Sequence, residues 1–318
     1  MKTSSWLLNR QVLSALCATP FLLSSAFANA GEAAPAEAAP VAPAEAAAPA
    51  VEATPAVEAA APAEPASPHT FTLNLGAYTQ YMFRGVALSD GPALQGGADY
   101  AHSSGFYAGT WFSNVDKEFF GHGDGFSGGN RVEIDIYAGW AKAFENGFGV
   151  NFLGNYYWYP DHEDSFRSPA FKGQNQDTFE VSAALTYKWL TYTFYYIPTD
   201  YYGANRTDDT LTQIKKGDTE GATYQELKFN YTLPFADLNL LAKAGYQKTP
   251  GLEGDQGDWA IGLNRNFSLP SSGKPIEGFN AGAVLTGTFD VENELFYNTF
   301  DGRDTNKGTI TFFVKRTW

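Results

Sequence analysis

Cysteine is almost absent from this chain of 318 residues, in which Cys17 is the only one. It lies near the N-terminus, in a stretch that reads as a cleaved leader, so the mature chain would have no disulfides, no thiolate metal site and no cysteine nucleophile. Basic side chains are also scarce: 21 Lys and Arg stand against 35 Asp and Glu, and the formal net charge is −14. This balance excludes nucleic acid as a partner, because binding its phosphates needs a basic surface.

The chain also lacks a run of about 20 apolar residues, the length that a membrane-spanning helix requires. Its mean hydropathy of −0.29 argues against a bundle of such helices. Histidine occurs only four times, at His69, His102, His122 and His162. The last two stand beside acids, but neither cluster has the spacing of a metal site, so we interpret both as solvated loop charges. We expect no metal and no cofactor.

Residues 1–30 have the features of a secretory signal peptide: a basic N-terminal part, a short apolar stretch and a small-x-small cleavage site at Ala28 and Ala30. The apolar stretch is too short to span about 30 Å of hydrocarbon, which argues against a membrane anchor. A lipid-attachment site at Cys17 is disfavoured because Leu16 precedes it, where such a site has a small residue. We therefore predict export and cleavage after Ala30.

Residues 31–68 are of low complexity: 18 of the 38 are Ala, eight are Pro and six are Glu, and none is aromatic. With nothing to bury, this segment forms no core. Frequent proline blocks helix, so we predict a disordered, extended tether in the periplasm. A passive spacer is the simpler interpretation, and contact with a periplasmic partner or with the cell wall is the alternative.

Residues 69–318 hold 47 of the aromatic residues and alternate with period two almost throughout, which is typical of half-buried strands. For example, Ile134 and Ile136 alternate with Glu133 and Asp135. Twelve strands are expected, and most are longer than the roughly 5–6 residues usual in globular sheets and suit tilted membrane strands of about 9–11. We place them at 70–83, 93–101, 105–113, 130–143, 147–158, 177–188, 190–197, 222–233, 238–247, 257–267, 278–290 and 306–318.

The connections between these segments fit a membrane barrel. All eight prolines beyond residue 68 fall between the expected strands, as their missing N–H requires. Long connections alternate with mostly tight turns, and both ends of the region lie on the short-turn side. We therefore predict an all-β fold, a transmembrane antiparallel β-barrel of about 12 strands at 69–318.

Aromatic residues gather at both strand ends, as in the two interfacial girdles of such barrels. A secreted β-sandwich, the alternative, would have a polar outer face. The long-loop girdle is expected to contain Tyr81, Phe83, Trp111, Trp158, Tyr196, Tyr246 and Trp259, and the short-turn girdle Phe106, Phe144, Phe148, Trp189, Tyr231, Phe267 and Phe279.

The last strand ends in an alternating series of Phe312, Val314 and the terminal Trp318. This series resembles the C-terminal signature that the barrel assembly machinery of outer membranes recognises. Arg316 departs from the signature, although a charge at the interface costs only about 0–1 kcal/mol. We expect the assembly machinery, outer-membrane lipid and lipopolysaccharide as partners.

The stretch YMFRGVALSDGPALQGG at 81–97 resembles the TorF family of porin-like outer-membrane barrels of proteobacteria, a conserved family without an established function. The match continues through DYAHSSGFYAG at 99–109, with weaker echoes at 133–139 and 156–160. The resemblance implies a channel-like role in the outer membrane of a Gram-negative bacterium. It implies no catalytic residue and no substrate.

Charged residues on the expected inner face of the barrel are the candidates for lining a lumen. They serve either as structural ion pairs across the wall or as a field that orients solutes. At the extracellular mouth, Arg84 is expected to hold Asp90, or else to be a turn residue at the interface. The lumen candidates are Asp99, Arg131, Glu133, Asp135, Glu180, Glu226, Lys228 and Lys243, with Lys188, Asp258 and Lys315 on the same face.

These features favour a porin or channel for passive diffusion of small hydrophilic solutes or ions. The six long connections hold 18 acids and nine bases, which predicts a modest cation preference that fades as salt rises. Twelve strands are intermediate between a filled and an open barrel, so a plugged structural or surface-interaction barrel is the alternative. A lipid-acting enzyme is a remote alternative, since no expected strand interior holds a histidine to act as a base; we expect no enzyme.

Overall fold

The computed structural model describes residues 67–89, 91–115, 131–160, 176–203, 219–234, 237–251, 255–290 and 308–318. The signal peptide expected at 1–30 and nearly all of the tether expected at 31–68 lie outside these ranges and stay predictions. The acidic clusters around His122 and His162 also lie outside them.

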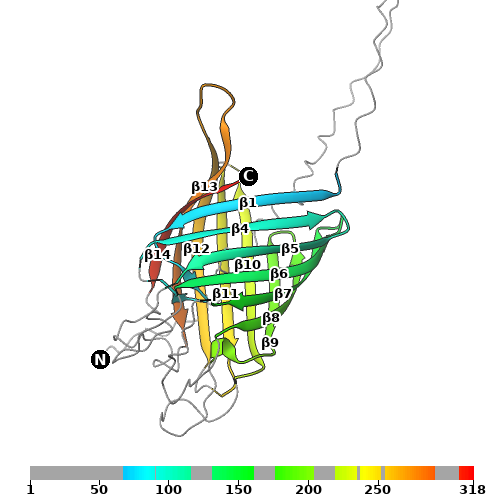
Figure 1. The fold of residues 1–318 in the computed structure, drawn as a ribbon, viewed down its shortest axis with the longest axis vertical. Helices are drawn as coiled ribbons and strands as arrows, with labels where there is room; N and C mark the ends of the chain where they lie inside the picture. Colours follow the sequence, from blue (N-terminus) through cyan, green and yellow to red (C-terminus); the bar gives the residue numbers. More distant parts are fainter. Residues whose placement is uncertain are drawn as a thin grey trace, which may run out of the picture.

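Twelve antiparallel strands form one closed barrel, which confirms the predicted fold (Figure 1). Strand β1 closes the ring because it pairs with both β4 and β14. The pairing leaves no free edge in the barrel sheet. The barrel strands are β1 (His69–Tyr78), β4 (Ala93–His102), β5 (Phe106–Asn114), β6 (Val132–Ala143), β7 (Phe148–Trp158), β8 (Thr178–Tyr187), β9 (Leu190–Ile197), β10 (Ala222–Leu233), β11 (Leu238–Lys248), β12 (Gln256–Leu269), β13 (Ile276–Phe289) and β14 (Thr309–Thr317).

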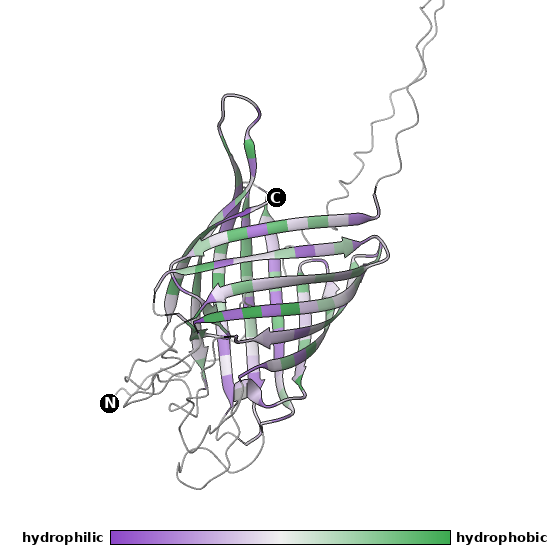
Figure 2. Cartoon of the chain, in the orientation of Figure 1, coloured by the Kyte–Doolittle hydropathy of each residue, from purple (hydrophilic) through white to green (hydrophobic). Residues whose placement is uncertain are grey.

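Apolar and polar residues alternate along the strands (Figure 2), and the large apolar side chains are those exposed on the outer face. On β8, Phe179, Val181 and Leu185 are exposed, whereas Glu180 between them is buried. Large apolar side chains exposed all round a closed wall would be costly in water, but they are the lipid-facing band of a membrane barrel. The alternation therefore accounts both for the barrel fold and for a lipid environment around it.

The expected aromatic girdles are only partly present. At the short-turn end Phe106, Phe144, Phe148 and Trp189 are exposed, and at the long-loop end Trp158 and Tyr196 are exposed. The girdle assignment is wrong for three residues, which are buried inside the barrel: Tyr81, Phe83 and Trp111. Trp111 follows the inward parity of β5, and the other two leave the wall with the segment that follows β1.

The first strand ends at Tyr78, five residues before the predicted end. The chain then forms a hairpin of two short strands, β2 (Met82–Phe83) and β3 (Val86–Ala87), which pair with each other and not with the barrel. The alternation alone could not reveal this break, because Tyr81 and Phe83 continue the outward parity of β1. This lumenal hairpin, residues 80–89, is the main departure from the predicted architecture.

The short turns and both ends of the barrel lie at the same end of the molecule, and the long connections lie at the other. The β12–β13 hairpin extends beyond the rim at the short-turn end (Figure 1). Among the described residues, the helical structure is one 3-10 turn, η2 (Tyr201–Gly203). In that part of the chain no helix has the length and apolar character needed to cross a bilayer.

Candidate functional site

The lumenal hairpin is specified by its own sequence. Arg84 and Gly85 form its two-residue turn with φ angles of 45° and 81°, the pattern of a type I′ turn, whose second position favours glycine. The Leu88 N–H donates to the Tyr81 carbonyl at 2.8 Å and closes the base of the hairpin. The Tyr81 N–H in turn donates to Ser89 Oγ at 2.7 Å. These local bonds define the shape of the hairpin, and contacts with the wall set its position.

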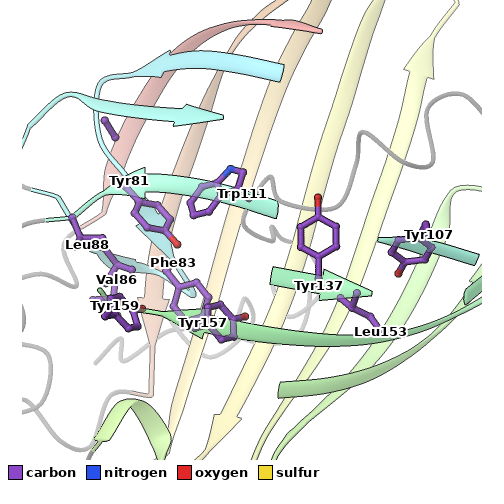
Figure 3. Packing of buried hydrophobic residues seen from close by; sticks show 12 residues of the cluster. Tyr81, Phe83, Val86, Leu88, Tyr107, Trp111, Tyr137, Leu153, Tyr157 and Tyr159 are labelled. Atoms are coloured by element: carbon purple, nitrogen blue, oxygen red, sulfur yellow. The ribbon is translucent and has the colours of Figure 1, made fainter. Parts of the chain in front are cut away.

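Apolar packing holds the lumenal hairpin against the inner surface of β5 to β7 (Figure 3). The Tyr81 ring meets Trp111 edge-on at a centroid distance of 5.5 Å, and Phe83 meets Tyr157 in the same way at 6.2 Å. Burying one such side chain stabilises a structure by about 1.5–3 kcal/mol, so several together anchor the hairpin. The other buried members of this cluster are Val86, Leu88, Ala93, Tyr107, Val115, Tyr137, Leu153 and Tyr159.

Arg84 binds the hairpin tip to the opposite side of the barrel wall, at β8, β11 and β12. Its guanidinium donates to Glu180 Oε2 on β8 at 2.6 Å and to Gln247 Oε1 on β11 at 2.9 Å. Gln256 on β12 donates from Nε2 to the Arg84 carbonyl at 2.7 Å. The guanidinium also lies over the Tyr224 ring of β10, 4.1 Å from its centroid. Since the hairpin starts from β1 and β4, these contacts make it cross the lumen.

Gly85 brings the backbone of the tip against the wall. A Cβ atom at this position would lie 2.6 Å from Thr288 Cγ2 and 2.9 Å from Asp258 Cβ. Both the positive φ and the close approach therefore require glycine. The tip contacts β12 and β13 at this point.

Glu133 on β6 fastens the base of the hairpin. The Tyr81 hydroxyl donates to Glu133 Oε1 and the Tyr159 hydroxyl donates to Oε2, each at 2.8 Å. Burial, together with the charge of Glu133, raises the pKa of both phenols well above the ordinary value. The phenols therefore stay protonated and remain donors to the carboxylate.

Lys243 on β11 stands between two buried acids. Its Nζ lies 3.2 Å from Glu226 Oε2 and 2.9 Å from Asp258 Oδ1. It also donates to the Tyr224 hydroxyl at 2.7 Å, and that hydroxyl donates to Asp258 Oδ2 at 2.8 Å. One lysine thus serves two carboxylates, which leaves an excess of negative charge on this side of the lumen.

Asp135 on β6 and Asn155 on β7 are joined by one hydrogen bond, from Asn155 Nδ2 to Asp135 Oδ2 at 3.0 Å. Their remaining oxygens, Asp135 Oδ1 and Asn155 Oδ1, are buried and have no hydrogen-bond partner in the part of the chain that the structure describes. Asn155 stands directly across the strand pair from Glu180. We use the name constriction for the buried charged residues inside the barrel, together with their immediate neighbours; the charged residues are Arg84, Glu133, Asp135, Glu180, Glu226, Lys243 and Asp258. The constriction contains acceptors that the described residues leave unfilled.

The half of the lumen nearer the short turns has a more neutral lining. Asp99 on β4 accepts a hydrogen bond from the Tyr137 hydroxyl. Asn280 on β13 donates to Asn264 Oδ1 at 2.9 Å and to Asn266 Oδ1 at 2.7 Å. The charged constriction is thus confined to the half nearer the long connections.

The predicted lumen residues divide into three groups. Glu133, Asp135, Glu180, Glu226 and Lys243 come together at the constriction, each at most 3% exposed. Asp99 and Lys228 lie on the inward side of their strands, half-buried and nearer the short turns. Arg131, which is exposed and precedes β6, forms the third group.

Arg131 lies outside the barrel strands, and its place at the lumen stays a prediction. Pairing with β5 begins at Val132, so Arg131 precedes β6 and is exposed, with its carbonyl accepting from the Val115 N–H at 2.9 Å. Lys188 is also exposed, in the turn after β8 with a φ of 51°. The inner wall is therefore more acidic than expected. Its acids are Asp99, Glu133, Asp135, Glu180, Glu226 and Asp258, and its bases are Lys228, Lys243 and Lys315.

The mouth prediction paired Arg84 with Asp90. Asp90 lies outside the described residues, and the structure gives Arg84 a wall partner, Glu180, inside the barrel. Sequence reasoning missed Tyr81, Gln247 and Gln256 as residues of the site. The inward parity of the strand expected at 238–247 marked Gln247, whereas Gln256 lay one residue before the strand expected at 257–267 and carried no such signal. The Arg-Gly pair between apolar dipeptides marked the turn.

The C-terminal residues lie at the seam that closes the barrel. Phe312 and Val314 face outward on β14. The Trp318 N–H donates to the Leu73 carbonyl at 2.9 Å, and the Leu73 N–H donates back at 3.3 Å. Arg316 lies over the rings of Phe279 and Trp318, at 5.2 and 4.8 Å from their centroids. These placements leave recognition by the assembly machinery a prediction.

Comparison with known proteins gives a fold-level likeness and a family. The chain is similar to a solved KdgM porin, with 8% identity and a TM-score of 0.41, over 78% of this chain and 98% of that one. It is similar to OccD3 (OpdP) of Pseudomonas aeruginosa, with 10% identity and a TM-score of 0.35, over 78% and 64% of the two chains. OprD of the same organism has 12% identity and a TM-score of 0.34, over 77% and 66%.

No curated protein matches the chain. A family model described as a bacterial protein of unknown function (Gcw_chp) matches residues 62–318, which include the whole barrel. The chain therefore belongs to the Gcw_chp family.

Proposed function

We propose that the protein is a narrow, porin-like channel through which small hydrophilic solutes or ions diffuse, with a modest preference for cations. The observation that carries the proposal is the charged constriction, in which Arg84, Glu180 and Lys243 are all buried inside the barrel. Buried ion pairs are weak evidence for stability, since apolar residues of similar size often replace them without loss. Charges retained there favour a role in handling solutes.

The cation preference is supported by the composition of the inner wall. Six carboxylates share it with three lysines, and Arg84 adds one more base from the hairpin. Because the acids of the constriction are buried, added salt screens them less than it screens exposed loop charges. We therefore place part of the selectivity in the wall, in addition to the acidic long connections.

The proposed location is the outer membrane of a Gram-negative bacterium, reached by export and cleavage after Ala30. The lipid-facing band and the terminal Trp318 support insertion by the barrel assembly machinery among lipid and lipopolysaccharide. We retain the resemblance of 81–97 to the TorF porin-like family as part of this proposal. That stretch includes most of the lumenal hairpin.

A plugged barrel with a structural or surface-interaction role is the second candidate. Its specific support is the lumenal hairpin itself, whose Tyr81, Phe83 and Leu88 are buried among wall side chains. An enzyme has less support. The histidines of the described strands, His69 and His102, both lie at the short-turn rim, away from the constriction.

Planar bilayer recording with the purified full-length protein separates the two candidates. The channel predicts small, discrete conductance steps from the wild-type protein. The plugged barrel predicts silence from the wild type, and steps only after the lumenal hairpin is shortened. Silence from both proteins, with folding verified by heat-shifted gel mobility, would contradict the channel.

A further inference from the structure

Several buried oxygen atoms at the constriction have no hydrogen-bond partner among the described residues, and two of them, Asp135 Oδ1 and Asn155 Oδ1, belong to neighbouring side chains. Asp135 and Asn155 are 2% and 7% exposed, and neither Asp135 Oδ1 nor Asn155 Oδ1 accepts a hydrogen bond. The bond between Asn155 Nδ2 and Asp135 Oδ2 uses the amide donor, so the amide oxygen is the end left open. Buried acceptors are nearly always satisfied in native proteins, which points to a group that the described residues do not supply.

The surrounding charges show that this group is positive. Glu133 is bound by two neutral phenols, and Glu180 is bound by Arg84 and by the Tyr157 hydroxyl at 3.1 Å. Three carboxylates thus share a single arginine. Lys243, the other buried base among the described residues, is already bound to acids on β10 and β12.

We propose that Asp135 Oδ1 and Asn155 Oδ1 form an open binding site for a hard inorganic cation such as Ca²⁺. Carboxylate and amide oxygens are the ligands that such cations take. The role of the site in ion passage rests on the proposed channel function, whereas the binding itself does not. No three His, Cys, Asp or Glu side chains of the described ranges converge on a metal position, so water completes the coordination shell.

Two protein ligands make a weak site, and weakness suits a position on an ion path. An ion must bind favourably enough to enter a narrow pore and weakly enough to leave it. Asp135 faces the lumen from β6. Trp111 on β5 and Tyr157 on β7 are its direct cross-strand neighbours. These rings give the site a spectroscopic reporter.

The test uses Tb³⁺, which replaces Ca²⁺ at oxygen sites and luminesces when a nearby aromatic ring is excited. The wild-type protein, full-length and in detergent, should show a saturable luminescence component that Ca²⁺ displaces. Asp135→Asn should weaken this component at least about tenfold, since the charge of the ligands sets the affinity of such sites. Asn155→Asp keeps the oxygen and adds a charge, so it should bind about tenfold more tightly.

Asp255→Asn is the matched control, because Asp255 is partly exposed and pairs with the exposed Lys248 at 3.2 Å, whereas Asp135 is buried. It should leave the component unchanged. Heat-shifted gel mobility verifies that each variant folds. Luminescence that is equal in the wild type and Asp135→Asn, or binding by Asn155→Asp no tighter than wild type, would overturn the site.

The binding assay and the bilayer recording fail independently. A conducting wild-type protein without the Tb³⁺ component would overturn the cation site and leave the channel standing. A silent protein with the component would overturn the channel and leave the site standing.

Discussion

Arg84 joins more parts of the barrel than any other single side chain at the constriction described above. Its guanidinium bonds to β8 and β11, its carbonyl accepts from β12, and its plane lies over Tyr224 of β10. A planar fork with several fixed donors can satisfy Glu180 and Gln247 together, which a lysine ammonium does less well. Arg84 therefore fixes the position of the hairpin tip.

Arg84→Ala should enlarge the pore and destabilise the protein. The change frees the hairpin tip and leaves Glu180 buried without its ion-pair partner, a loss typically of about 3–5 kcal/mol. Single-channel conductance and urea unfolding followed by heat-shifted mobility measure the two effects. The control is Arg265→Ala, which removes an exposed pair with Asp237 worth only about 0–1 kcal/mol. Unchanged conductance in Arg84→Ala would contradict the claim that Arg84 fixes the hairpin tip across the pore.

Lys243→Met tests the second charge cluster. Without the ammonium group, Glu226 and Asp258 would face each other as buried, uncompensated carboxylates, and the loss of stability should again be about 3–5 kcal/mol. Lys228→Met is the matched control, since Lys228 is half-buried on β10 and has no ion pair among the described residues. Equal destabilisation by the two variants would contradict the claim that Lys243 stabilises the barrel by compensating Glu226 and Asp258.

At the scale of elements, the strands were predictable and the lumenal hairpin was not. A lipid-facing side chain must be apolar at every second position, so the pattern marks each strand; β10, for instance, has the predicted bounds. The hairpin depends instead on contacts across the lumen, such as those from Arg84 to residues 96 and 172 positions later. Local alternation carries no information about partners at that distance.

Replacing the lumenal hairpin with a short Gly-Ser turn should raise conductance several-fold, because it removes the buried aromatic cluster members of residues 80–89 from the pore. The comparison variant shortens the turn at 270–275, at the far end of β12 and β13, and should leave conductance unchanged. Both variants are recorded in planar bilayers. Wild-type conductance from the hairpin replacement would mean that the narrowest point lies elsewhere.

At the scale of the whole molecule, the position of the two ends of the barrel predicts its orientation in the membrane. Both ends of the barrel lie with the short turns, and the long connections lie opposite, as in outer-membrane barrels whose short turns are periplasmic. The acidic constriction then faces the extracellular side. An entering cation would meet Arg84 and the buried acids before it reached the half that contains Asp99, Lys228 and the asparagines.

Cysteines introduced at Gly203 and at Ser104 should report this orientation, because the cleavage predicted after Ala30 would remove Cys17, the one native cysteine. Gly203 ends η2 at the long-loop end, and Ser104 is exposed in the turn after β4. On intact cells, a membrane-impermeant maleimide should label only the Gly203 variant, and permeabilised cells should allow both to react. Labelling of only the Ser104 variant on intact cells would show that the barrel has the opposite orientation.

The most direct test of a cation-preferring pore is the reversal potential of the purified protein in a KCl gradient, recorded at low salt and near 1 M. The screening length falls from about 8 Å at physiological salt to about 3 Å at 1 M. Loop charges alone would then lose their effect, whereas the buried acids Glu133, Asp135 and Glu180 should keep part of theirs. The account predicts cation preference at low salt that shrinks but persists at 1 M. Anion preference at low salt would contradict it.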